Sequence, residues 1–165
     1  MQIINKININ APVETLWKIL ADDYNDICQW TSVVTSSTEN PELPQGEGRA
    51  CELPDGAVAK ETLTKMDKEQ HNFSYKVELS GMPFFVRGME NSWRVEQYGH
   101  NQSLVTFEID VTLLPVFAQL MGPLMKIKFN KLASVVFEEL KFYAETGKVH
   151  PRKHELLSAN IGRVA

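Results

Sequence analysis

The sequence predicts an α+β protein in which a curved antiparallel sheet of seven strands wraps around a long C-terminal helix. Two observations predict this class. Residues 72–79 and 105–113 alternate apolar and polar side chains, which is typical of antiparallel strands with one face in water. Residues 117–145 then repeat apolar side chains at helical spacing. The apolar face of the sheet must be covered, and this helix is the only predicted element long enough to cover it, so the sheet has to curl around the helix.

The N-terminal part predicts one strand and two short helices. Residues Ile3–Ile9 alternate with period two, which indicates a strand that ends at Asn10-Ala11-Pro12. A proline suits the first turn of a helix. The next apolar residues fall at i, i+3, i+4 and i+7 and form one helical stripe: Val13, Leu16, Trp17 and Leu20. A second short helix is expected over residues 22–29.

The middle of the chain is predicted to be β. The β-branched run Thr31–Ser36 opens this region. Two further strands, Arg49–Leu53 and Val58–Met66, flank the turn Pro54-Asp55-Gly56. Residues Phe84–Gln97 form another strand, so the β region comprises about six strands before the final helix.

The C-terminal part predicts one long helix and a tail. Gly122-Pro123 lies inside the helical pattern and predicts a break or kink. Gly147 is placed as a helix-terminating glycine. Residues 1–147 are therefore expected to form a single domain, and residues 148–165 a loose tail or one extra turn.

Composition excludes several classes of protein. The chain has 165 residues, of which 43% are hydrophobic, so it can enclose a core and is not a disordered protein. The net charge of −4 disfavours nucleic acid as a partner. No apolar run reaches the roughly 18 residues that a membrane span needs. The N-terminus lacks a secretion signal, and Cys28 and Cys51 show no metal-binding spacing, so a cytoplasmic protein with reduced thiols is expected.

An ordered set of short motifs over residues 2–146 resembles the SRPBCC superfamily of START-like, or birch-pollen-allergen-like, helix-grip proteins. The resemblance is strongest to its polyketide cyclase/dehydrase and lipid-transport branch. It implies a helix-grip fold with a ligand cavity between the sheet and the last helix. It does not fix the function, since the superfamily includes carriers, receptors and enzymes. The motifs are Ile9-Asn10-Ala11-Pro12-Val13-Glu14-Thr15-Leu16-Trp17, Trp30, Gly46-Glu47-Gly48-Arg49, Glu61-Thr62-Leu63, Asp67, Tyr75, Phe107, and Leu140-Lys141 with Glu145.

The first candidate binding residues lie on one face of the predicted strand Phe84–Gln97. The residues on this face are mostly large and apolar, so the face is expected to point inward. They are Phe85, Arg87, Met89, Asn91, Trp93 and Val95. Arg87 and Asn91 would then orient the polar end of a ligand, because such groups are costly to bury unpaired. Alternatively, Arg87 pairs with Glu61 or reaches the rim of the cavity. A β-bulge could also reverse the phase and turn Glu90 inward.

Glu61 and Tyr75 are the other polar candidates. Glu61 shares a phase with Ala59 and Leu63, and an inward carboxylate could act as a general base or pair permanently with Arg87. Tyr75 lies in the inward phase, where its hydroxyl could bind a ligand carbonyl or a backbone group. The resemblance implies that the position of Glu61 and those of Met89, Asn91 and Phe107 line the pocket.

The last helix contributes an apolar stripe and a basic group. Met121, Met125, Phe129 and Leu132 are expected to face the cavity, where methionine would adapt to varied ligands, or to pack as ordinary core. Three lysines, Lys126, Lys128 and Lys131, form either a solvated face or a docking patch for an acidic membrane surface.

These residues favour a non-catalytic binder or carrier of a small apolar molecule with one polar end, such as a lipid, isoprenoid or polyketide. One alternative is a cyclase or dehydratase that uses Glu61 as base with Tyr75 or Arg87 polarising a carbonyl. Another is a protein-interaction module with a filled cavity. No metal-site, phosphate-loop or nucleophile motif is found, so no metal and no cofactor are expected. We also expect transient contact with a membrane surface, and we expect the protein to be a monomer or a homodimer.

Overall fold

Seven antiparallel strands form one sheet in a computed structural model that describes the backbone of residues 1–161 and the side chains of residues 1–156. The spatial order is β1-β7-β6-β5-β4-β3-β2, so the first strand pairs with the last. The predicted class and strand number are confirmed. The strands are β1 (Gln2–Ile9), β2 (Ser36–Glu39), β3 (Gly48–Glu52), β4 (Val58–Asp67), β5 (Asn72–Leu79), β6 (Val86–Gly99) and β7 (Gln102–Leu113).

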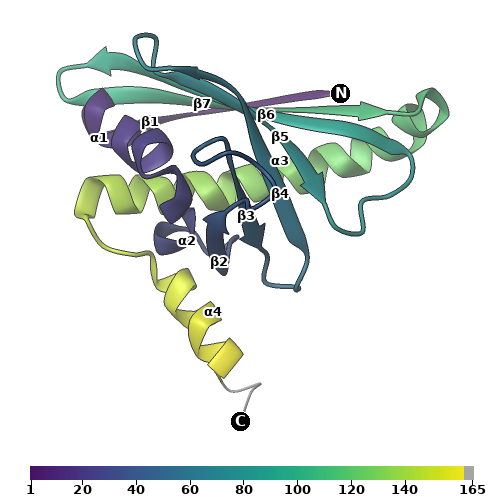
Figure 1. The fold of residues 1–165 in the computed structure, drawn as a ribbon. Coiled ribbons are helices and arrows are strands. Elements are labelled where there is room, and N and C mark those ends of the chain that lie inside the picture. Colours follow the sequence, from purple (N-terminus) through teal and green to yellow (C-terminus); the bar gives the residue numbers. More distant parts are fainter. Residues whose placement is uncertain (162–165) are drawn as a thin grey trace.

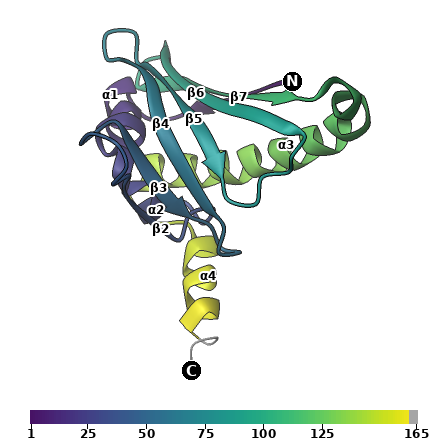
Figure 2. The ribbon, with the colours of Figure 1, turned by 45° about the vertical axis from the view of Figure 1, so that its right-hand side comes forward.

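The long helix α3 crosses one face of the sheet, and the short helices α1 and α2 lie near its C-terminal end (Figure 1). Seen from the side, the sheet bends so that β2 and β3 descend beside α3 while β6 and β7 lie above it (Figure 2). This is the predicted helix-grip arrangement. The helices are α1 (Val13–Trp17), the π-helical turn η1 (Lys18–Asp22), the 3₁₀ turn η2 (Tyr24–Asp26), α2 (Ile27–Trp30), α3 (Pro115–Thr146) and α4 (Pro151–Ile161).

The core is dense where the second half of α3 meets the sheet. Trp93 on β6 stacks on its cross-strand partner Phe107 on β7, with ring centroids 4.1 Å apart. Phe137 of α3 packs edge-on against both rings. Neighbouring positions on α3 at helical spacing are also buried: Ala133, Val136 and Leu140. The inward phase of β5 and β7 therefore faces α3, as the alternation predicts.

The first half of α3 packs less tightly. Met121, Met125 and Phe129 are half-buried, in contrast to the fully buried residues farther along the helix. Pro123 lies inside α3, which runs uninterrupted from Pro115 to Thr146, so of the expected break or kink the break does not occur. Pro123 is exposed, whereas its neighbour Gly122 is buried, and a Cβ at residue 122 would lie 3.7 Å from the Sδ atom of Met1.

The segment after the long helix is neither the loose tail nor the single extra turn that was expected, because buried polar contacts hold it as a helix. Residues 151–161 form α4, and residues 162–165 of the expected tail lie outside the described residues. Lys153 is buried and donates a hydrogen bond to the carbonyl oxygen of Val34, 2.6 Å away. Arg152 pairs with Glu138 and Glu139 of α3 at 2.8 and 3.3 Å. Among residues 1–161, no helix is long and apolar enough to cross a membrane.

Candidate functional site

A buried polar cluster lies on the inner face of the sheet, next to the short helices. We define it as Tyr24, Arg49, Glu61, Tyr75 and Asn91. Arg49 on β3 lies directly opposite Glu61 on β4, and its Nε donates to Glu61 Oε2 at 2.7 Å. Both side chains are almost completely shielded from solvent. The pair is therefore an internal ion pair, and its energetics depend on how well its remaining polar atoms are bonded.

Tyr24 completes the coordination of this ion pair. Its hydroxyl donates to Glu61 Oε2 at 2.9 Å, and its backbone carbonyl accepts a hydrogen bond from Arg49. The guanidinium of Arg49 lies over the Tyr24 ring, 3.8 Å from the centroid, in cation–π geometry. Since Tyr24 belongs to η2, these contacts fix the short helices against β3 and β4.

The protonation of the cluster follows from burial and from this pairing. Burial is the largest single influence on the pKa of Arg49 and lowers it, but the charge of Glu61 acts together with Tyr24, Cys51 and Tyr75 in the opposite direction, and the net shift is upward. Burial, and then the charge of Glu61, raises the pKa of the Tyr24 hydroxyl. Arg49 is therefore a permanent cation, and Tyr24 is a neutral hydrogen-bond donor.

Tyr75 and Asn91 form the part of the cluster that faces α3. They are cross-strand partners on β5 and β6, and the Tyr75 hydroxyl oxygen accepts from Asn91 Nδ2 at 3.4 Å and from Trp93 Nε1 at 3.3 Å. Burial raises the pKa of Tyr75, so its O–H stays available as a donor. Asn91 Oδ1 is buried and has no hydrogen-bond partner among the described residues. A buried amide oxygen of this kind is costly unless a partner approaches it.

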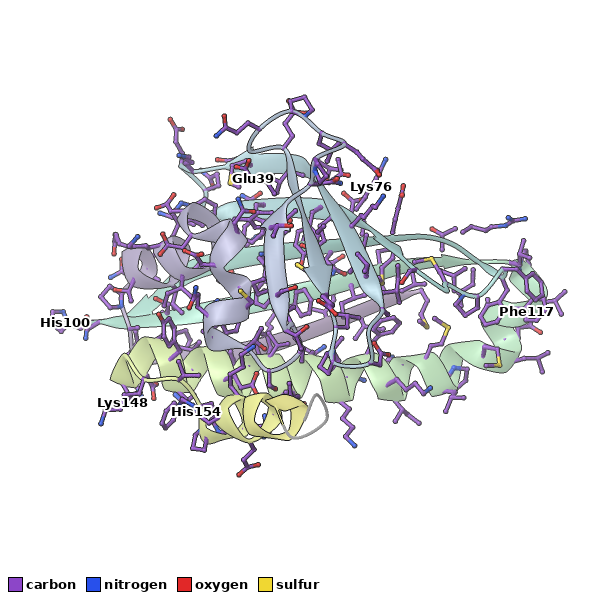
Figure 3. The ribbon with its side chains drawn as sticks, turned by 60° about the horizontal axis from the view of Figure 1, so that its bottom comes forward. Glu39, Lys76, His100, Phe117, Lys148 and His154 are labelled. Atoms are coloured by element: carbon purple, nitrogen blue, oxygen red, sulfur yellow. The ribbon has the colours of Figure 1, made fainter. Side chains whose placement is uncertain are left out.

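An apolar wall with a burial gradient extends from this cluster toward the start of α3. Trp93 and Phe107 are buried at the deep end, whereas Met89 on the same face of β6 is half-buried. Across from the sheet, α3 presents the half-buried side chains already described. At the far end, Phe85 stacks on Phe117 with centroids 4.9 Å apart, near the α3 terminus that Figure 3 marks by Phe117. The wall is thus packed at one end and loose at the other.

The structure brings most of the predicted site residues to this region. Glu61, Tyr75, Trp93 and Phe107 are buried at one end of it, together with Asn91, which is half-buried but has a buried Oδ1. The half-buried members are Phe85, Met89, Met121, Met125 and Phe129, and Leu132 is 41% exposed. The partner of Glu61 is Arg49, and not Arg87 as one alternative held.

Arg87 does not lie on the inner face of the sheet, and that expectation is corrected. The ladder between β6 and β7 shifts register between Val86 and Gly88, which makes Arg87 the extra residue of a bulge. Arg87 is exposed and lines a surface depression of about 350 Å³ together with Lys76 and Glu90. Glu90 also faces outward, where it accepts a hydrogen bond from Thr64, so the bulge does not turn it inward.

Arg49 and Tyr24 are the functional candidates that the sequence analysis missed. A signal for Arg49 was present, because Arg49 and Glu61 are equally distant from Asp55 in the predicted turn. A symmetric hairpin would make them direct cross-strand partners, as they are. Tyr24 carried no such signal, since its position depends on how η2 packs on the sheet.

A small pocket of about 10 Å³ adjoins Arg49. It is bordered by Trp30, whose buried Nε1 has no hydrogen-bond partner within the described part of the chain. Within residues 1–156, no three side chains of the His, Cys, Asp or Glu type are grouped as a metal site would require.

Comparison with known proteins identifies a family that matches this chain. Residues 2–145 match the family described as polyketide cyclase / dehydrase and lipid transport. Similar solved structures include a START superfamily protein from Mycobacterium smegmatis, with a TM-score of 0.72 and 15% identity over 89% of this chain and 99% of that chain. For protein XoxI from Bacillus cereus the TM-score is 0.71 and the identity 19%, over 90% of this chain and 99% of that chain. For truncated norcoclaurine synthase from Thalictrum flavum the TM-score is 0.68 and the identity 13%, over 90% of this chain and 95% of that chain. No curated protein was found to match. These structures support the fold alone.

Proposed function

The chain belongs to the polyketide cyclase/dehydrase and lipid-transport family, and from its site we propose that it binds and carries a small, mostly apolar molecule with one polar end. Family and fold fit a protein that binds a hydrophobic ligand. A lipid, an isoprenoid and a polyketide-like compound all have the required combination of a long apolar part and a single polar group.

The buried, unpartnered Asn91 Oδ1 is the observation that carries the proposal. It lies beside the Tyr75 hydroxyl, so a ligand group that both donates and accepts hydrogen bonds could use both atoms. A hydroxyl or a protonated carboxyl group has this property. Recognition of the polar end would therefore come from Asn91 and Tyr75, while Arg49 and Glu61 hold the surrounding strands.

The apolar part of the ligand would lie along the half-buried wall. Each Å² of apolar surface removed from water contributes about 25 cal/mol, so contact with this wall supplies most of the affinity. Three of its residues are methionines, Met89, Met121 and Met125, whose flexible side chains adjust to different shapes. This composition supports a carrier that accepts a class of molecules rather than a single compound.

The contacts of Glu61 favour a carrier over the cyclase alternative. A general base must reach the proton that it removes. Glu61 Oε2 already accepts hydrogen bonds from Arg49 and Tyr24, and the carboxylate is enclosed by them. In the proposed role Glu61 is a structural partner of Arg49.

Native mass spectrometry tests the proposal. The freshly purified protein should carry a co-purified molecule, or should gain mass when mixed with a panel of fatty acids, isoprenoid alcohols and aromatic polyketides. Asn91→Leu should lower the occupied fraction, and Arg87→Ala, on the outer face, should not change it. A chain that gains no mass from any compound would refute the proposal. A bound compound recovered in altered form would favour the cyclase instead.

A further inference from the structure

Four large apolar side chains form an exposed stripe on the first half of α3. They are Val116, Leu120, Leu124 and Ile127, with exposed fractions of 68%, 71%, 49% and 67%. Their spacing of four, four and three residues keeps them on one side of a helix with 3.6 residues per turn. Eleven residues at 1.5 Å each give the stripe a length of roughly 16 Å.

This stripe points away from the sheet. The residues that bury α3 against the sheet, Ala133, Val136, Phe137 and Leu140, follow the same helical spacing. At about 100° per residue, the centre of the buried set lies roughly opposite the centre of the stripe. The stripe is therefore separate from the ligand-binding wall, and packing within the chain does not explain it.

One exposed aromatic residue extends the apolar surface. Phe84, in the connection between β5 and β6, is 71% exposed and packs edge-on against Phe117 in the first turn of α3, with centroids 5.3 Å apart. We call Phe84 and the stripe together the outer patch. Several large apolar side chains exposed at one end of a molecule are typical of an interaction site.

The charge around the outer patch identifies its partner. Lys126, Lys128 and Lys131 are all exposed on the same part of α3. Residues 111–137 contain these three lysines and no aspartate or glutamate, although the whole chain has a net charge of −4. The basic charge is thus concentrated where the apolar residues are exposed. An anionic bilayer surface offers the matching chemistry, since apolar side chains enter the interface while lysines meet acidic headgroups.

We propose that the outer patch docks this protein on the surface of an anionic lipid bilayer. Helix α3 lies along the bilayer with its stripe in the interfacial layer, and Phe84 enters beside its first turn. The loose end of the ligand-binding wall then lies about one helix diameter, roughly 10 Å, from the bilayer, because Met121 and Met125 belong to the same turns of α3 as the stripe but to another face of the helix. That last step rests on the proposed function, whereas the docking itself does not.

Co-sedimentation with lipid vesicles tests the docking. The protein should bind vesicles made of equal parts phosphatidylcholine and phosphatidylglycerol, and it should bind pure phosphatidylcholine much more weakly. Leu120→Ser/Ile127→Ser should abolish sedimentation. Lys126→Gln/Lys128→Gln/Lys131→Gln should weaken binding on the order of 100-fold, because each lysine near an anionic surface contributes roughly a fivefold factor.

A matched control removes the same charge elsewhere. Lys6→Gln/Lys68→Gln/Lys76→Gln changes three exposed lysines outside α3, and it should leave vesicle binding close to that of the unmodified chain. Circular dichroism melting establishes that all variants fold. Binding of cis-parinaric acid in the absence of vesicles should be unchanged in the stripe variant, which separates failure of docking from failure of ligand binding.

Three results would overturn the proposal. The unmodified chain could ignore anionic vesicles, the two triple lysine variants could lose binding equally, or the stripe could cover a second copy of the chain. In the last case the protein would sediment as a dimer in ultracentrifugation, and Leu120→Ser/Ile127→Ser would convert it to a monomer.

Discussion

Arg49 is the residue on which the internal polar cluster depends most. Arg49→Met would leave the Glu61 carboxylate and the Tyr24 carbonyl buried without their partner. Removing one member of a buried ion pair costs about 3–5 kcal/mol, so the free energy of unfolding should fall by that amount. Urea unfolding followed by circular dichroism measures the change.

Two controls show whether the unpaired charge is the cause. Arg49→Met/Glu61→Leu removes both charges and should recover most of the lost stability, because an apolar pair can replace a buried ion pair. The exposed pair Lys60–Glu42 is a matched comparison, and Lys60→Met should cost less than about 1 kcal/mol. A double variant that is no more stable than Arg49→Met would contradict this account.

The Cys51 thiol should make the free energy of unfolding depend on pH in the alkaline range. Burial raises the pKa of its thiol to about 11 from an ordinary 9.0. Between these values the folded state keeps the proton and the unfolded state loses it, so stability is intact below pH 9 and falls as the pH rises toward 11. Two pKa units correspond to a loss of about 2–3 kcal/mol.

Comparison with Cys51→Ala isolates this contribution. The tyrosines with raised pKa values, Tyr24 and Tyr75, are present in both proteins, so their effects cancel in the difference. The unmodified chain should lose stability more steeply than the variant in urea unfolding from pH 8 to 11. Parallel curves would show that Cys51 titrates normally.

Sequence reasoning at the residue scale succeeded where strand alternation was unbroken. Tyr75 and Asn91 lie on the inner face of the sheet, as the alternation predicts, and the structure shows that they pair across β5 and β6. The prediction for Arg87 failed because one extra residue in a bulge changes which face of the strand a side chain lies on. The sequence does not mark where a bulge falls. Glu139 was missed entirely. It is fully buried and accepts hydrogen bonds from Thr31 and Ser32, which no local pattern reveals.

At the scale of elements, strand β3 can approach β4 closely because residue 48 is glycine. A Cβ at Gly48 would lie 2.2 Å from the carbonyl oxygen of Glu61 and 2.7 Å from Leu43 Cδ1. Gly48→Ala should therefore push β3 away from β4 and reduce the free energy of unfolding by about 2–3 kcal/mol. Thermal and urea unfolding both measure this.

Gly88 provides the matched control for that substitution. It also lies in a strand, but a Cβ there would meet nothing within 4 Å. Gly88→Ala should change stability by less than about 0.5 kcal/mol. Equal effects at the two glycines would mean that strand propensity, and not the close approach of β3 to β4, determines the cost.

Elements with their own periodicity were predictable, and elements held by distant partners were not. Strands β5 and β7 and the long helix α3 follow from alternation and helical spacing. The run Thr31–Ser36 has β-branched residues, yet β2 begins only at Ser36, because Thr31 and Ser32 are engaged with Glu139. Helix α4 likewise depends on contacts of Arg152 and Lys153 with residues far away in the sequence.

At the scale of the whole molecule, the protein has two ends with different packing. The end near Trp93, Phe107 and Phe137 is dense and stabilises the fold. The end near Met89 and Met125 is loose, and it lies beside the exposed apolar and basic surface of α3. The burial of the wall, the unpartnered Asn91 oxygen and the charge distribution all support uptake of an apolar ligand at the loose end.

Filling the loose end is the most direct test of this account. Met89→Trp adds bulk on the inner face of β6, and Thr112→Trp adds the same bulk on the outer face of the adjoining strand. We would titrate both variants and the unmodified chain with cis-parinaric acid, exciting the probe directly. The account predicts saturable binding that Met89→Trp weakens at least about tenfold, a loss of 1.4 kcal/mol, and that Thr112→Trp leaves unchanged. Equal binding by both variants, or none by the unmodified chain, would contradict it.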